Sequence, residues 1–366
     1  MPGDSARTVV DPEEARGHAE KFATVVASLD GGLEGEITLG PEPLEVFDLT
    51  GVRLFYDFPL MAGGTVVGHV RAAADRRVAA AVVALERRPR RWDAGEALDR
   101  ALAAAQARNP QANMTRESAR IVCYSYPKLA VQVGTVLYDV ATGTEVPITG
   151  LAGQSNARPY LARFADAEAR VRAFEVDAAA LQEAADAVAY KIVPGPIISF
   201  GAQVWLAPEC QDVLGVPLLG QITPINCVPA SAEMVLDHYG WNYSQDEIAQ
   251  AMGTSPANNG TLYNPGVVQG IATLTKNTMT PAETDAGQSR QVQWDLMVNE
   301  IGANRPLFTQ MPGHYRVCVG YHQTLFIQLL HIHDPWPPNP NVCQGGADYW
   351  ENWSGSQIEW FVTLTH

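Results

Sequence analysis

The sequence lacks the features that would define a disulfide-bonded, zinc-binding or membrane-spanning protein at once. Its five cysteines are scattered and include no CxxC pair, so neither a disulfide framework nor a zinc ribbon is indicated. No run of about eighteen apolar residues occurs, and we therefore expect no membrane span. We also expect no cofactor and no bound metal.

Positive charge is scarce as well. The 366 residues carry a formal net charge of −15, which argues against nucleic acid or an anionic membrane as the main partner. Residues 201–366 contain only 4 basic residues against 14 acidic ones. The first twenty residues show no apolar run of signal-peptide type, so a cytoplasmic location is the default expectation, with secretion left open.

The uneven charge predicts two units of ordinary size. We expect a flexible N-terminus over residues 1–25 that passes into a short helix around residues 12–29, an α+β domain of unknown role over 26–193 and a linker over 194–201. The linker is predicted because Pro194, Pro196 and two neighbouring glycines end regular structure. Residues 202–366 would form the second domain.

The first unit has the pattern of a strand meander followed by helices. Apolar runs between residues 43 and 88 are broken at Thr50-Gly51, Gly63-Gly64 and Asp75–Arg77, which are typical turns. A helix is predicted after Asp93, an N-cap with Glu96 three residues on. This unit contains no recognisable pair of nucleophile and base.

The second unit places helices before strands. One helix is predicted around Pro229 and another after Ser244, which forms a capping box with Glu247. Strands dominate from about residue 306 to the end. Helices first and an antiparallel sheet afterwards give an α+β fold class rather than a βαβ alternation.

Cys227 is the candidate nucleophile. It stands at the predicted amino end of the Pro229 helix, where the helix dipole stabilises a thiolate. The segment MPGHYRVCVGYHQTLFIQLLHIHDP predicts a hairpin with its turn near His322-Gln323. A turn of two or three residues would place His314 opposite His331 or Ile332, with Asp334 one diagonal step away. A base oriented by a carboxylate needs such an arrangement.

Gln221 lies six residues before Cys227. A developing oxyanion needs donors beside the nucleophile, commonly a backbone N–H and a side-chain amide. The chain between the two residues is long enough to turn back and bring the amide of Gln221 to Cys227.

The ordered set Gln221, Cys227, His314 and Asp334 resembles that of papain-like cysteine peptidases. The wording Q-x5-C-x-x-A-S-x-x-M-V-L-x-x-Y-G and the segments GHYRVCVGY and DP are similar to the bacteriocin-processing branch, which cleaves leaders after a double glycine. The resemblance covers about residues 215–366 and implies a papain-like domain acting on a peptide or protein. In that case Cys227 attacks, His314 is the base, Asp334 orients His314 and Gln221 lines the oxyanion hole. Val228-Pro229 replaces the Gly-Ala that usually follows the cysteine in that branch.

Several alternatives stay open. The same triad could serve another acyl transfer or amide hydrolysis, or survive in a non-catalytic peptide-binding module. His331 and His333 share one face of a predicted strand, which is compatible with a metal, together with His322 or Asp334. The first unit could be an intramolecular inhibitor resembling a propeptide, or a scaffold.

Overall fold

The fold is a mixed α+β arrangement, seen in a computed structural model. The structure describes residues 8–29, 37–111, 114–146, 159–164, 166–192, 209–212, 215–258, 260–261, 265–284 and 287–365. The expected linker at 194–201 lies outside these ranges. The described helices are α2 (Pro12–Leu29), α3 (Ala94–Arg108), α4 (Ala167–Ile192), α5 (Cys227–His238), α6 (Gln245–Ala251), α7 (Pro265–Leu274) and α8 (Arg290–Gly302).

The described strands form a single sheet of 15 strands. Those before residue 150 are β1 (Ile37–Leu39), β2 (Leu44–Phe47), β3 (Arg53–Ala62), β4 (Thr65–Ala73), β5 (Val82–Glu86), β6 (Ala119–Ser125), β7 (Lys128–Val133) and β8 (Val136–Asp139). The later ones are β9 (Glu209–Asp212), β10 (Thr280–Glu283), β11 (Leu307–Met311), β12 (His314–Gln323), β13 (Gln328–Asp334), β14 (Ala347–Asn352) and β15 (Trp360–Thr365). Their order is β10-β15-β11-β12-β13-β14-β5-β4-β3-β2-β6-β7-β8, with β1 on β3 and β9 on β12.

The predicted turns and caps of the first half are confirmed. Strands β2 to β5 follow one another, with positive φ angles at Gly51, Gly63 and Gly64, which L side chains rarely adopt. The side chain of Asp93 accepts a hydrogen bond from the backbone of Glu96 and begins α3. In the second half, Ser244 and Glu247 form the capping box of α6.

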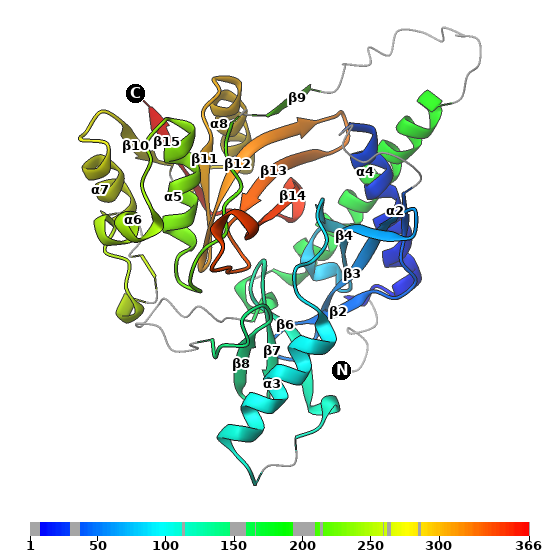
Figure 1. Cartoon of the computed structure of the whole chain (residues 1–366). Coiled ribbons are helices and arrows are strands. Elements are labelled where there is room, and N and C mark those ends of the chain that lie inside the picture. The colour runs from blue at the N-terminus through cyan, green and yellow to red at the C-terminus, as the bar shows by residue number, and fades with distance from the viewer. Residues whose placement is uncertain are drawn as a thin grey trace, which may run out of the picture.

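The short helix expected around residues 12–29 is confirmed, so the expected flexible N-terminus does not extend over residues 12–25. These residues form most of helix α2, which buries Ala15, Ala19 and Phe22 and packs against α4, β4 and β5 (Figure 1). Polar residues occupy the opposite face, as in an amphipathic helix.

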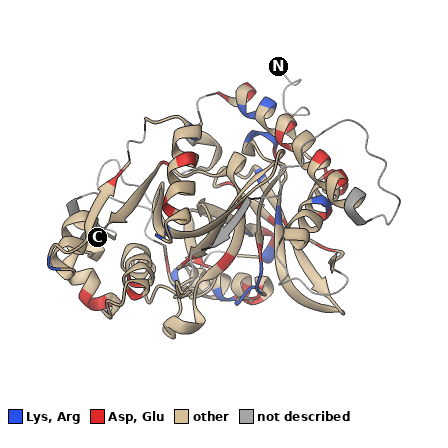
Figure 2. Ribbon diagram, turned by 90° about the horizontal axis from the view of Figure 1, so that it is seen from above, with Lys and Arg blue, Asp and Glu red and all other residues tan. Residues whose placement is uncertain are grey.

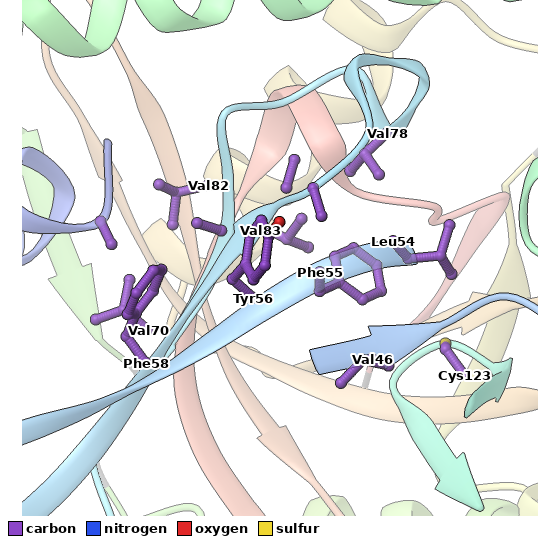
Figure 3. Packing of buried hydrophobic residues seen from close by; sticks show 14 of the residues in the cluster. Val46, Leu54, Phe55, Tyr56, Phe58, Val70, Val78, Val82, Val83 and Cys123 are labelled. Carbon is purple, nitrogen blue, oxygen red and sulfur yellow. The ribbon is translucent and has the colours of Figure 1, made fainter. Parts of the chain in front are cut away.

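Two large hydrophobic clusters follow the two predicted halves of the chain. In the first, aromatic and aliphatic side chains from β3, β4 and β5 interdigitate, including Phe55, Tyr56 and Phe58 (Figure 3). The second surrounds α5 and strands β11 to β15. The first cluster also contains Trp336 and Trp350 of the second half, so the halves share apolar contacts as well as a sheet.

The seam between the halves is a pair of hydrogen-bonded strands. Strand β5 pairs antiparallel with β14, with Glu86 opposite Tyr349 and Ala84 opposite Glu351. Arg87 adds an ion pair to Asp348, 2.7 Å from guanidinium nitrogen to carboxylate oxygen. The division into two domains stays a prediction, because this pairing joins both halves in one sheet.

Acidic positions spread over helices at both ends of the molecule rather than gathering in one patch (Figure 2).

None of the helices within the described ranges combines the length and hydropathy that crossing a bilayer requires.

The hairpin of β12 and β13 has another register than predicted. Its loop is Thr324–Ile327, closed by hydrogen bonds from the backbone of Phe326 and Ile327 to the hydroxyl of Thr324. A bulge follows between Cys318 and Gly320, so that Gly320 rather than His314 lies opposite His331. The predicted turn at His322-Gln323 is therefore wrong, because both residues belong to strand β12.

Candidate active site

Cys227 lies at the amino end of a buried helix. It is the first residue of α5 and 8% exposed, and α5 packs against β12. Pro229 occupies the first turn, where its missing N–H leaves no helical hydrogen bond unmade. The preceding turn is closed by the Thr223 hydroxyl, which lies 2.6 Å from the side-chain oxygen of Asn226. The sulfur thus sits where the helix dipole favours negative charge.

His314 and Asp334 meet although their register differs from the prediction. His314 opens β12 and Asp334 ends β13, the neighbouring antiparallel strand. His314 Nε2 lies 2.7 Å from Asp334 Oδ1, and both residues are fully buried. A carboxylate can only accept, so Nε2 carries the hydrogen and Nδ1 is the nitrogen left for a proton from a thiol.

Asp334 is held as a carboxylate. Burial raises its pKa, but the charge and hydrogen bond of His314, the charge of Arg316 and the backbone N–H of Trp336 outweigh burial and lower it. The Trp336 N–H donates to Oδ1 over 2.8 Å.

The thiol of Cys227 is acidic for a buried cysteine. Burial opposes its ionisation, but the positive charge of Lys128, the imidazole of His314 and the backbone of Tyr315 bring its pKa down to about 6. Nδ1 of His314 has no partner at ordinary hydrogen-bond distance within the described residues, so the hydrogen bond through which the imidazole lowers the pKa of the thiol, ahead of its charge, is a long one. Such contacts commonly tighten when substrate binds.

Gln221 connects the segment before Cys227 to the segment that follows Asp334 at the end of β13. Its backbone N–H donates to the carbonyl of Pro335 and its own carbonyl accepts from Asn339. Its side-chain amide donates to the carbonyl of Thr223 over 2.6 Å, and the residue is fully buried. One amide N–H is engaged in this way, and the other stays available as a donor.

A hairpin of the first half covers the strand end at His314. The hydroxyl of Ser125 donates to the carbonyl of Pro312 over 2.8 Å, and Lys128 Nζ donates to the carbonyl of Gly313 over 2.9 Å. Lys128 is 4% exposed. Sequence reasoning missed Lys128, because a single lysine at the start of a strand gives no functional signal.

The candidate metal ligands do not come together as the sequence suggested. His331 and His333 lie near Asp348, and Asp334 is engaged by His314 instead. His322 is buried elsewhere on β12, and burial lowers its pKa to about 4. The guanidinium of Arg87 contacts both His331 Nε2, at 2.9 Å, and Asp348. A divalent cation could enter this cluster only if Arg87 moved.

Other cysteine, tryptophan and histidine side chains of the second half differ in their surroundings. Cys318 is buried and its thiol contacts the carbonyl of Gly320, whereas Cys343 is exposed. Trp336 is 6% exposed, and its indole N–H donates to Asp139 Oδ2 over 3.4 Å. His238 is half-buried on α5.

Comparison with known proteins supports a peptidase in the second half. Residues 213–358 match the family model described as Peptidase_C39 like family. No curated protein matches the chain. One similar solved structure is a mutant fragment of Prevotella intermedia prointerpain A, with 10% identity, a TM-score of 0.38 and coverage of 90% of this chain and 98% of that chain. The family match supports a cysteine peptidase of the papain-like class, and the bacteriocin-processing branch stays a prediction.

Lys128 should control the ionisation of Cys227. In Lys128→Met the thiol loses the positive charge that lowers its pKa most, so its pKa is expected to rise by about one unit and thiolate to be lost between about pH 6 and 7. The ultraviolet absorbance of the thiolate, taken as the difference from a Cys227→Ser background, measures this titration. Lys276→Met, which removes an exposed lysine, should leave it unchanged. Equal midpoints in both variants would contradict the role of Lys128.

Proposed function

We propose that this protein is a cysteine peptidase that hydrolyses peptide bonds with Cys227, His314, Asp334 and Gln221. The observation that carries the proposal is the buried hydrogen bond between His314 and Asp334, next to a helix-borne thiol whose pKa is about 6. A nucleophile, a base and an orienting carboxylate are the components of thiol acyl transfer.

The proposed reaction has two stages. His314 Nδ1 takes the proton of the Cys227 thiol, and the thiolate attacks the scissile carbonyl carbon. The C–N bond then breaks as Nδ1 gives that proton to the departing amine, leaving a thioester. Water then attacks the thioester carbon, His314 takes a proton from the water, and the C–S bond breaks to release the acid. The backbone N–H of Cys227 and the amide of Gln221 would stabilise the oxyanion in both stages.

Profiling with a peptide library tests this proposal. Incubation of the full chain with the library should give products with new free carboxyl and amino ends, identified by mass spectrometry. Products joined to an added amine would instead assign the chain to acyl transfer. Peptides that are retained but never cleaved would assign it to peptide binding.

We also propose that the first half of the chain restrains this site. The support is the β6–β7 hairpin, which holds the Pro312-Gly313 carbonyls beside His314 while Gln221, His314 and Asp334 are fully buried. A peptide substrate needs access to Cys227, so the hairpin must move before cleavage. The first half would then act as an inhibitor within the same chain.

A larger side chain at the contact between Ser125 and Pro312 should relieve the proposed inhibition. Ser125 is 1% exposed, and overpacking by Ser125→Leu costs about 1–3 kcal/mol, so turnover by the full chain is expected to rise about tenfold. Ser28→Leu makes the same change at an exposed position of α2 and should leave turnover unchanged. If Ser125→Leu cleaves the library peptides no faster than the parent, the hairpin does not inhibit.

A further inference from the structure

Asp334 has a second partner besides His314. Its Oδ1 accepts from His314 Nε2 and from the backbone of Trp336, and its Oδ2 accepts from the hydroxyl of Tyr349 over 2.9 Å. Tyr349 belongs to β14, which lies beside β13 in the sheet (Figure 1). Both carboxylate oxygens of Asp334 are therefore fixed, one by the histidine side of the site and one by Tyr349.

The hydroxyl of Tyr349 has only one possible orientation. Arg316 Nη1 donates to it over 2.7 Å, and a guanidinium cannot accept a hydrogen bond. The hydroxyl hydrogen must therefore point toward Asp334. Burial keeps the pKa of Tyr349 well above its usual range, so the hydroxyl remains a donor at every working pH.

Arg316 is itself held in place by a charge. Its guanidinium makes an ion pair with Glu351 of β14, with a second contact of 3.2 Å to Oε1. Arg316, Glu351 and Asp334 are each 0% exposed, and Tyr349 is 4% exposed. A continuous hydrogen-bond network therefore runs from Glu351 through Arg316, Tyr349 and Asp334 to His314.

We propose that Tyr349 is a positioning residue of this site: its hydroxyl, oriented by Arg316, fixes the carboxylate of Asp334 and through it the ring of His314. The catalytic consequence rests on the peptidase function proposed above, whereas the effect on the thiol–imidazole pair does not. Two-point anchoring of the carboxylate restricts its rotation and thereby the direction in which the imidazole faces Cys227.

Other charged groups also surround Asp334. His314 and Arg316 act on it directly, and Asp57, His69, Arg71 and Glu86 of strands β3, β4 and β5 line a small cavity together with it. Among them Glu86 has its pKa raised to about 7 by burial, then by Asp57 and more weakly by Asp334. A test on Tyr349 must leave all these groups in place, which Tyr349→Phe does.

Tyr349→Phe keeps the ring and removes only the hydroxyl. We expect the titration midpoint of the Cys227 thiolate to rise by about one unit and kcat for library peptides to fall about tenfold with KM unchanged. Tyr243→Phe is the matched control, since its hydroxyl donates to the carbonyl of Leu274, away from the site. The control should change neither quantity, and thermal unfolding of both variants checks that they are folded.

The two readouts separate this proposal from the proposed function. A raised thiolate midpoint in a chain that cleaves no peptide would keep the positioning role and remove the peptidase. Unchanged midpoint and kcat in Tyr349→Phe, in a chain that does cleave peptides, would overturn the positioning role. A rise of the midpoint by the same amount in Tyr243→Phe would overturn it too.

Discussion

Cys227→Ser is expected to reduce peptide hydrolysis by the full chain about a thousandfold or more, while the fold is retained. The oxygen of serine is close in size to the sulfur, but its proton is far harder to remove, so the lowered pKa that Lys128 and His314 give the thiol is lost. Because the nucleophile takes part in every turnover, kcat should fall with little change in KM. Turnover of a fluorogenic library peptide measures both quantities.

The matched control is Cys343→Ser. Cys343 is an exposed free cysteine of the same half of the chain, and its replacement should leave kcat unchanged. Hydrolysis that survives Cys227→Ser at the parent rate would show that another group attacks the substrate, and the peptidase proposed on Cys227 would be abandoned.

The pairing of His314 with Asp334 was predictable from the sequence, although by a partly wrong route. Both residues mark strand ends in one hairpin, and the ends of adjacent antiparallel strands lie at one edge of the sheet. The turn was misplaced because Leu325, Phe326 and Ile327 read as strand residues. Leu325 is 82% exposed in the loop. Hydrogen bonds from the backbone of Phe326 and Ile327 to the Thr324 hydroxyl close this loop, which has neither an Asn-Gly nor a Gly-rich turn.

The cover over the site was not predictable. Ser125 and Lys128 contact Pro312 and Gly313 across 187 and 185 residues of sequence. Periodicity and capping signals describe local structure, and no local signal states which distant strand a hairpin will touch. The pairing of β5 with β14, which joins both halves in one sheet, could not be predicted from the sequence for the same reason.

The hydrogen-bond network of Tyr349, Arg316 and Glu351 at Asp334 could not be predicted from the sequence either. Arg316 stands between Tyr315 and Val317, as a solvent-facing strand residue would, and Glu351 is followed by polar Asn352, yet both charged residues are fully buried. Strands β12 and β14 flank β13 in the sheet, and their side chains Arg316 and Glu351 meet there as a buried ion pair. A charge on an interior strand becomes recognisable only when its partner strand is known.

Removing one charge of the buried Arg316–Glu351 pair is expected to lower the free energy of unfolding strongly. In Glu351→Gln the guanidinium of Arg316 stays buried without its counterion, and breaking a buried pair from one side costs about 3–5 kcal/mol. The free energy of unfolding, from urea denaturation followed by tryptophan fluorescence, measures the loss. Glu45→Gln, which breaks the half-exposed pair with Arg53, should cost less than about 1 kcal/mol. Equal losses in the two variants would contradict the prediction.

The double variant Arg316→Met/Glu351→Leu separates stability from positioning. Apolar residues of similar volume avoid the desolvation of two ions, so much of the stability lost in Glu351→Gln should return. The hydroxyl of Tyr349 would then have no donor to orient it, because Arg316 supplies the contact that turns its hydrogen toward Asp334. A double variant that is stable but has a raised thiolate midpoint would show that these charges serve the site more than the fold. A stable double variant with the parent midpoint would show that the orientation of Tyr349 does not depend on them.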